Sequence, residues 1–146
     1  MINKTETALQ KFASGYNCAQ SILYSFSNEI NIDSNVALKI ACGFGAGMGR
    51  RGEVCGAVTG GIMTIGAKYG KGENGDKTAT ETTYAKTKEL MDRFQEKHDS
   101  FICKELLDGT DLATEEGQLH FRENDLFNST CKKCVASVVQ ILEDIL

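Results

Sequence analysis

The sequence predicts an all-α protein: a single compact domain of six to eight helices over residues 1–146, with a glycine-rich segment between two of them. Its 146 residues are 41% hydrophobic, which suits one domain with one buried core. It has no proline, the residue that most strongly breaks helices. Apolar residues recur at helical spacing, and almost no stretch shows the alternation of a β-strand.

Helical periodicity is most regular in two segments, one near each end of the chain. An amphipathic helix is predicted in each, because apolar residues three and four apart share one helical face. These faces consist of Ala19, Ile22, Leu23, Phe26 and Ile30 in the first segment, and of Val135, Val138, Val139, Leu142 and Leu146 in the second.

Further helices are expected in the remaining segments. A short helix with Val36, Ala37, Ile40 and Ala41 follows Asp33 and Ser34, and another begins near Cys55 and includes Val58, Ile62 and Ile65. The charged stretch 76–97 predicts a surface helix whose narrow inner face carries Tyr84, Met91 and Phe94. Weaker patterns indicate helices over 4–13 and around 112–126, and the loop 71–76 is predicted to be a mobile tip.

Charge and hydropathy exclude several classes of function. The formal net charge is -4, which is the wrong sign for binding nucleic acid. The N-terminus lacks the apolar run of a secretion signal, and the apolar stretch 54–67 is too short to span a membrane. We therefore expect a cytoplasmic protein whose thiols are reduced, with no nucleic-acid partner and no membrane span. A redox partner and the oligomeric state cannot be named from the sequence.

The glycines are concentrated in one part of the chain. Twelve of the 15 fall between Gly43 and Gly75. Gly47, Gly49 and Gly52 match the dinucleotide-binding pattern Gly-x-Gly-x-x-Gly, but a predicted helix precedes them where that site requires a strand. Gly56 and Gly60, four residues apart, are instead predicted to let two helices approach closely.

The six cysteines are the candidates for chemistry. They are Cys18, Cys42, Cys55, Cys103, Cys131 and Cys134, and only the last two form a recognisable Cys-x-x-Cys motif. Cys18, Cys55, Cys103 and Cys131 each fall in or near a predicted first helical turn, where the helix dipole favours a thiolate. A thiolate is both the nucleophile of disulfide exchange and a metal ligand, whereas a buried thiol packs as a small hydrophobe. Arg50 and Arg51 are expected to flank the cysteines, with one of them near Cys55.

Three motifs carry a resemblance to a known family. They are Gly-Tyr-Asn-Cys-Ala-Gln at 15–20, Gly-Phe-Gly-Ala-Gly-Met-Gly at 43–49 and Cys-Gly-Ala-Val-Thr-Gly at 55–60. With them, the chain resembles the small redox-active proteins named for the pattern Cys, Gly-Cys-Ala-x-x-Gly, Cys, Cys, from about residue 12 to residue 146. In the family pattern, glycine directly precedes the second cysteine. In this sequence valine precedes Cys55 and glycine follows it, so the resemblance rests on the wider context. The resemblance implies that Cys18, Cys55, Cys103 and Cys134 are the four cysteines of the family pattern. It also implies that Cys42 and Cys131 lie outside that pattern.

The resemblance and the thiol chemistry together predict thiol-based redox chemistry, either thiol–disulfide exchange or electron transfer, that requires no cofactor. Cys55 is the expected nucleophile, and Cys18, Cys103 and Cys134 are its expected resolving partners. In the alternative interpretation, these four cysteines ligate an iron–sulfur cluster or a soft metal. A third interpretation is a helical protein with incidental thiols. The first two require the four cysteines to converge, and we assign Cys134 to that buried cluster and Cys131, with Arg50, Arg51 and Gly56, to an accessory role.

Overall fold

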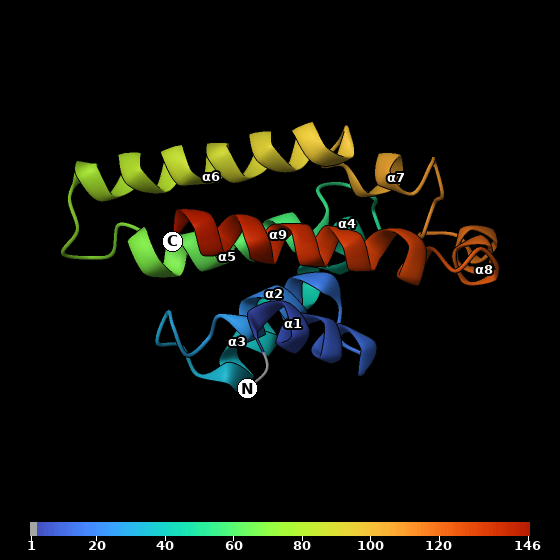
Figure 1. Cartoon of the computed structure of the whole chain (residues 1–146), viewed down its shortest axis with the longest axis horizontal. Helices are drawn as coiled ribbons and strands as arrows, with labels where there is room; N and C mark the ends of the chain where they lie inside the picture. The colour runs from blue at the N-terminus through green and yellow to red at the C-terminus, as the bar shows by residue number, and fades with distance from the viewer. Residues whose placement is uncertain (1–2) are drawn as a thin grey trace.

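The computed structural model describes residues 3–146, and within them the protein is helical, as predicted (Figure 1). Seven of its helices have eight residues or more: α1 (Lys4–Ala13), α2 (Cys18–Ser25), α3 (Ser34–Ala41), α5 (Gly56–Tyr69), α6 (Lys77–His98), α8 (Glu115–Glu123) and α9 (Lys132–Ile145). Shorter helical turns are η1 (Cys42–Phe44), α4 (Gly45–Met48), α7 (Cys103–Leu106) and the π-helical turn η2 (Phe127–Cys131).

The helices pack in three layers. Figure 1 shows α6 along one side, α5 and α9 in the middle, and α1, α2 and α3 on the other side, with α7 and α8 at one end. The core lies between these layers and includes Ile22, Phe26, Ile65, Phe94 and Leu142, each at most 1% exposed. Burial of such side chains, at about 1.5–3 kcal/mol each, is the main force that holds the layers together.

The helices α2 and α5, which belong to neighbouring layers, approach each other closely. A Cβ atom at Gly60 would lie 2.8 Å from the carbonyl oxygen of Ala19 and 3.0 Å from the Cβ of Ile22. A Cβ at Gly56 would lie 2.5 Å from the Sγ of Cys18. Two glycines one turn apart therefore let the backbone of α5 pack directly against α2, which confirms the prediction for Gly56 and Gly60.

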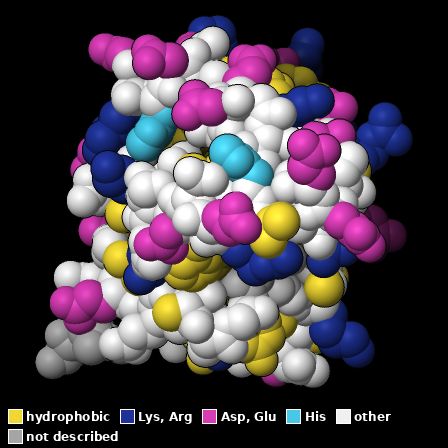
Figure 2. All heavy atoms as spheres, turned by 90° about the vertical axis from the view of Figure 1, so that its right-hand side faces the viewer, with side chains coloured by type: hydrophobic (Ala, Val, Ile, Leu, Met, Phe, Trp, Pro, Cys, Tyr) yellow, Lys and Arg dark blue, Asp and Glu magenta, His cyan; other side chains and the backbone are white. Residues whose placement is uncertain are grey.

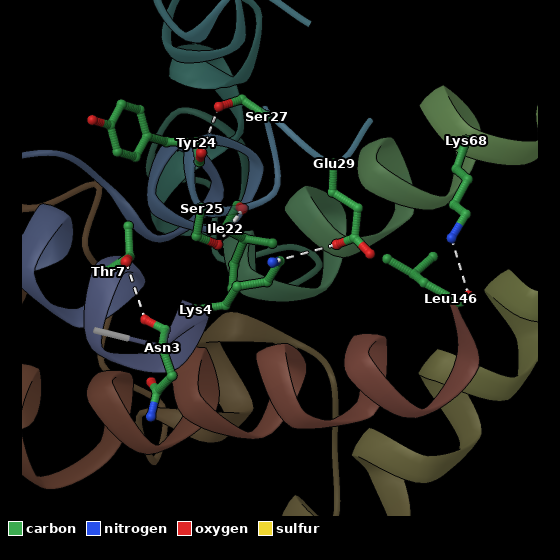
Figure 3. Close-up of polar contacts among 10 residues, drawn as sticks. All are labelled: Asn3, Lys4, Thr7, Ile22, Tyr24, Ser25, Ser27, Glu29, Lys68 and Leu146. Atoms are coloured by element: carbon green, nitrogen blue, oxygen red, sulfur yellow. Dashed lines mark hydrogen bonds and ion pairs between the residues drawn. The ribbon is translucent and has the colours of Figure 1, made fainter. Parts of the chain in front are cut away.

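The end of α2 differs from the prediction, which extended this helix to Ile30. Regular helix stops at Ser25, although Phe26 and Ile30 are buried in the core as expected. The hydroxyls of Ser25 and Ser27 donate hydrogen bonds to the carbonyls of Ile22 and Tyr24 (Figure 3). Side-chain donors that compete with the backbone amides weaken a helix at such a position.

The long helix α6 covers the core as predicted, but one residue of its inner face was assigned wrongly. Leu90 and Phe94 are fully buried, whereas Tyr84 is 67% exposed. Tyr84 lies six residues before Leu90, which places it about 120°, or one third of a turn, around the helix from that buried residue.

Polar contacts connect segments that are distant in the sequence (Figure 3). The ammonium of Lys4 lies 3.7 Å from the carboxylate of Glu29 and connects α1 with the turns after α2. Lys68, near the end of α5, donates a 3.0 Å hydrogen bond to the carbonyl of Leu146. Among residues 3–146, no helix combines the length and the hydropathy needed to cross a membrane.

Substitution of Gly60 by alanine tests the close packing of α2 on α5. The added methyl group would collide with the backbone of Ala19, so Gly60→Ala should lower the free energy of unfolding by about 1–3 kcal/mol. Gly66→Ala is the matched control on the same helix, because a Cβ there meets open space. It should instead stabilise the protein by about 0.5–1 kcal/mol through its higher helix propensity. Guanidinium unfolding of both variants measures the difference, and equal effects would contradict the proposed packing constraint.

Candidate functional site

Five of the six cysteines line one cavity of about 460 Å³: Cys18, Cys55, Cys103, Cys131 and Cys134. The four cysteines that were expected to converge therefore do so, although they come from four distant segments. Cys42 is exposed on the surface and does not line the cavity. All six thiols are free. Cys55, Cys103 and Cys134 are buried, while Cys18 and Cys131 are half-buried.

Hydrogen bonds connect three of these thiols in a row. Cys18 is bonded to Cys55, and Cys55 is bonded to Cys134. The interaction between Cys18 and Cys55 raises the pKa of Cys18 and lowers the pKa of Cys55. The interaction with Cys134 is the largest cause of the raised pKa of Cys55. Cys55 is therefore the middle thiol of the three.

The first motif, at 15–20, places Cys18 at the start of α2. Asn17 caps this helix by accepting a 2.9 Å bond from the amide of Gln20, and the Gln20 side chain accepts one from the amide of Asn17. The Asn17 side chain also donates a bond to the carbonyl of Cys42. A side chain at Gly45 would collide with Asn17. The Asn17 cap therefore depends on glycine at this position of the glycine segment.

A short antiparallel bridge brings Cys55 next to Cys103. Val54 pairs with Ile102, the amide of Cys55 donates to the carbonyl of Phe101, and the amide of Cys103 donates to the carbonyl of Glu53. The two cysteines thus flank one bridge, each directly before or at the start of a helix. This bridge was not predicted, because a single pair of residues leaves no alternating pattern in the sequence.

The glycine segment forms a left-handed turn beside the cysteines. All residues from Ala46 to Arg50 have positive φ angles, between 53° and 71°. Gly47 and Gly49 adopt this conformation freely, whereas Ala46, Met48 and Arg50 are strained in it. A Cβ at Gly47 would lie 2.8 Å from the Cβ of Cys103, so the turn packs directly against that cysteine. In addition, the backbone of Ala46 is hydrogen-bonded to the sulfur of Cys18. Strain of this kind is commonly found at functional sites.

The Cys-x-x-Cys motif lies at the junction of η2 and α9. Cys131 ends the π-helical turn, so helix precedes it, and the prediction that it occupies a free helix start is wrong. Leu126 before the turn already has helical backbone angles, so the chain continues into α9 without a capping residue. Cys134 is 3% exposed and bonded to Cys55, whereas Cys131 is half-buried in the wall of the cavity.

Neighbouring thiols and burial, and not the helix starts, dominate the ionisation of four of these thiols. Hydrogen bonding with a neighbouring thiol is the largest cause of the raised pKa of Cys18 and of Cys55, and burial adds to it. Burial raises the pKa of Cys103 and of Cys131 to about 12 in each case, with a smaller effect of charge on the neighbouring thiols. Backbone bonds from Ala19 and Ala57, in the first turns of α2 and α5, lower the pKa as the helix-start argument expects. They are outweighed, so these four thiols are protonated near neutral pH.

The rest of the cavity wall is mostly hydrophobic. Aromatic and leucine side chains from α1, α7, α8, η2 and the loop before α8 contribute: Phe12, Leu106, Leu107, Leu112, Phe121 and Phe127. Figure 2 faces the end of the molecule where α7 and α8 lie, and shows hydrophobic side chains there among charged ones. Arg50 lines the same cavity as Cys55, whereas Arg51 is exposed and does not line it. The close approach of an arginine to Cys55 stays a prediction.

Two polar residues of α8 are among the lining residues that were not predicted for the site. Arg122, in the last turn of α8, and Gln118, one turn before it, both line the cavity. The sequence contains no signal that connects α8 with the cysteines, because only the fold brings these segments together. Within residues 3–146, no group of three or more His, Cys, Asp and Glu side chains is arranged to hold a metal ion.

The raised pKa of Cys103 predicts a loss of stability at alkaline pH. The unfolded chain loses this proton near pH 8.5 and the folded chain near 12, so the stabilising contribution is complete below pH 8.5 and declines above it. Between pH 9 and 11 the decline is about 1.4 kcal/mol per pH unit for one thiol. The difference in unfolding free energy between the reduced wild type and Cys103→Ala should therefore narrow over this range. A difference that stays constant from pH 7 to 11 would contradict the raised pKa.

Comparison with known proteins agrees with the architecture of the site. The family model "Putative redox-active protein (C_GCAxxG_C_C)" matches residues 16–145, a range that contains all five cavity cysteines and the glycine segment. Searches of curated proteins and of solved structures found no significant match. The match covers nearly the whole chain, so this protein belongs to the C_GCAxxG_C_C family.

Proposed function

We propose that this protein carries out thiol–disulfide exchange with Cys55 as its central thiol. The observation that supports this most directly is the convergence of Cys18, Cys55 and Cys134 on one cavity, although they come from three distant segments. Cys55 is the middle thiol, because both Cys18 and Cys134 affect its pKa. A mixed disulfide at Cys55 would therefore have a resolving thiol beside it on either side.

The proposed reaction transfers two electrons from the protein to a disulfide. The Cys55 sulfur attacks one sulfur of the substrate disulfide, whose S–S bond breaks as the mixed disulfide forms. Cys18 or Cys134 then attacks Cys55, which closes an internal disulfide and releases the second substrate sulfur. Two protein thiols give up two protons and two electrons, and the two substrate sulfurs take them up as thiols.

Because the resting thiols are protonated, the reaction is slow in the absence of substrate. A thiol with a raised pKa reacts slowly, because only the thiolate attacks a disulfide. Deprotonation of one of the three thiols can be supported by its thiol neighbours, because hydrogen bonds to a charged acceptor are stronger than those to a neutral one. In this proposal the protein is protected from adventitious oxidation until a substrate occupies the cavity.

Counting free thiols before and after mild oxidation tests the proposal. The anaerobically purified, reduced protein should contain six free thiols, of which two should be lost on incubation with a small disulfide. Cys55→Ser should slow this loss by at least about tenfold, because the remaining cavity thiols lose their shared partner. Cys42→Ser is the matched control, since Cys42 lies outside the cavity, and it should lose two thiols at the wild-type rate.

The same samples discriminate the alternative function. If Cys18, Cys55, Cys103 and Cys134 hold an iron–sulfur cluster or a soft metal, the purified protein contains stoichiometric metal. The metal content should then be lower in Cys55→Ser and unchanged in Cys42→Ser. Metal-free protein with the expected loss of two thiols supports disulfide exchange. Stoichiometric metal, or wild-type oxidation in Cys55→Ser, would contradict it.

A further inference from the structure

The charge of the cavity wall differs from that of the whole protein. The chain has a net charge of -4, yet the residues that line the cavity include Arg50 and Arg122 and no aspartate or glutamate. The ion pairs among residues 3–146 involve other basic side chains, those of Lys4, Lys88 and Arg93. Both cavity arginines thus remain available to a ligand in the part of the chain that the structure describes.

The two arginines reach the cavity from different elements. Arg50 is the last residue of the left-handed turn, with a φ of 71°, and Arg122 belongs to the last turn of α8. Both are exposed, which places their charged groups at the solvent side of the cavity, while Cys55 and Cys134 are buried. The wall therefore presents sulfur at its buried end, hydrocarbon along its length and positive charge at its solvent side.

Shape and chemistry together specify a ligand class. A volume of about 460 Å³ is typical of a site for a small organic molecule, and a mostly apolar wall with a few polar groups is the usual composition of such a site. A guanidinium binds a carboxylate through paired hydrogen bonds. A ligand that matches all three parts of the wall has a reactive sulfur group, an apolar body and an anionic end.

We propose that the cavity selects small disulfides that carry an apolar chain and a carboxylate, and that Arg50 and Arg122 bind this carboxylate. This inference rests on the proposed disulfide exchange and names its substrate class. With the carboxylate at the arginines, the apolar chain lies along Phe12 and Phe127, and the disulfide reaches Cys55. Attack by Cys55 and closure with Cys18 or Cys134 then yield an internal protein disulfide and the dithiol form of the ligand, with two electrons and two protons transferred.

Lipoate and lipoamide form a suitable pair of probes, because they share the disulfide ring and the apolar chain and differ in the carboxylate. One equivalent of reduced protein should convert lipoate to its dithiol, and become oxidised itself, with a second-order rate constant about tenfold higher than for lipoamide, as expected for a hydrogen-bonded charge pair. Arg50→Gln and Arg122→Gln should each remove most of that preference and leave lipoamide reduction nearly unchanged. Arg51→Gln is the matched control, because Arg51 is the neighbour of Arg50 but does not line the cavity.

Octanoate, which has the chain and the carboxylate without the disulfide, should inhibit lipoate reduction competitively.

The outcomes separate this inference from the proposed function. Equal reduction of lipoate and lipoamide, with no effect of Arg50→Gln or Arg122→Gln, overturns the substrate class while disulfide exchange stands. Failure to reduce either probe, together with no loss of thiols on oxidation, overturns disulfide exchange and with it the inference. A preference for lipoate that Arg51→Gln abolishes and Arg50→Gln preserves also overturns the assignment of the arginines.

Discussion

The site depends on the close packing of α2 against α5. Gly56 and Gly60 bring the two helices into backbone contact, and this contact places the sulfur of Cys18 beside the start of α5, where Cys55 lies. A larger residue at either glycine would force the helices apart and separate the first pair of thiols. The other cysteines reach the same place by independent means: Cys103 by its bridge to the segment before Cys55, and Cys134 on the helix α9.

The same packing determines the electrostatics of the site. Thiols at helix starts have lowered pKa values when they remain accessible to solvent. Here the backbone amides of α2 and α5 do act in that direction on Cys18 and Cys55, but burial and thiol–thiol hydrogen bonds act more strongly in the opposite direction. The result is a set of protonated thiols at the buried end of a hydrophobic cavity. Such a site is suited to a substrate that excludes water and approaches the sulfurs directly.

The strained turn is the second constraint. Five consecutive residues with positive φ pack against Cys103 and Cys18, and the last of them, Arg50, faces the cavity. Three of the five are not glycine, and each left-handed residue of that kind costs about 1–2 kcal/mol. The surrounding contacts, including the fit of Asn17 against Gly45, must offset this cost. The glycine-rich segment is therefore a structural support for the thiol site, in place of the dinucleotide loop that its spacing superficially matches.

Periodicity was sufficient to predict the helices of eight residues or more, apart from the end of α2, because apolar residues three and four apart leave a repeated signal in the sequence. The close approach at Gly56 and Gly60 was also accessible, since glycines one turn apart leave a strip of bare backbone on one face of a helix. Tyr84 was misplaced because a long, charged helix offers several rows of isolated apolar residues. The convergence of the cysteines was inferred from chemistry and family resemblance. The bridge at Val54, the π-helical turn before Cys134 and the role of Arg122 in the wall arise only from tertiary packing, and no local pattern encodes them.

The identity of the disulfide that forms on oxidation is the most direct test of the central role of Cys55. Peptide mass spectrometry of the mildly oxidised protein, after alkylation of the remaining thiols, identifies the linked cysteines. We predict that Cys55 is linked to Cys18 or to Cys134, the two thiols to which it is hydrogen-bonded. A disulfide between Cys131 and Cys134, with Cys55 recovered as an alkylated thiol, would show that the Cys-x-x-Cys motif reacts independently and would contradict that role.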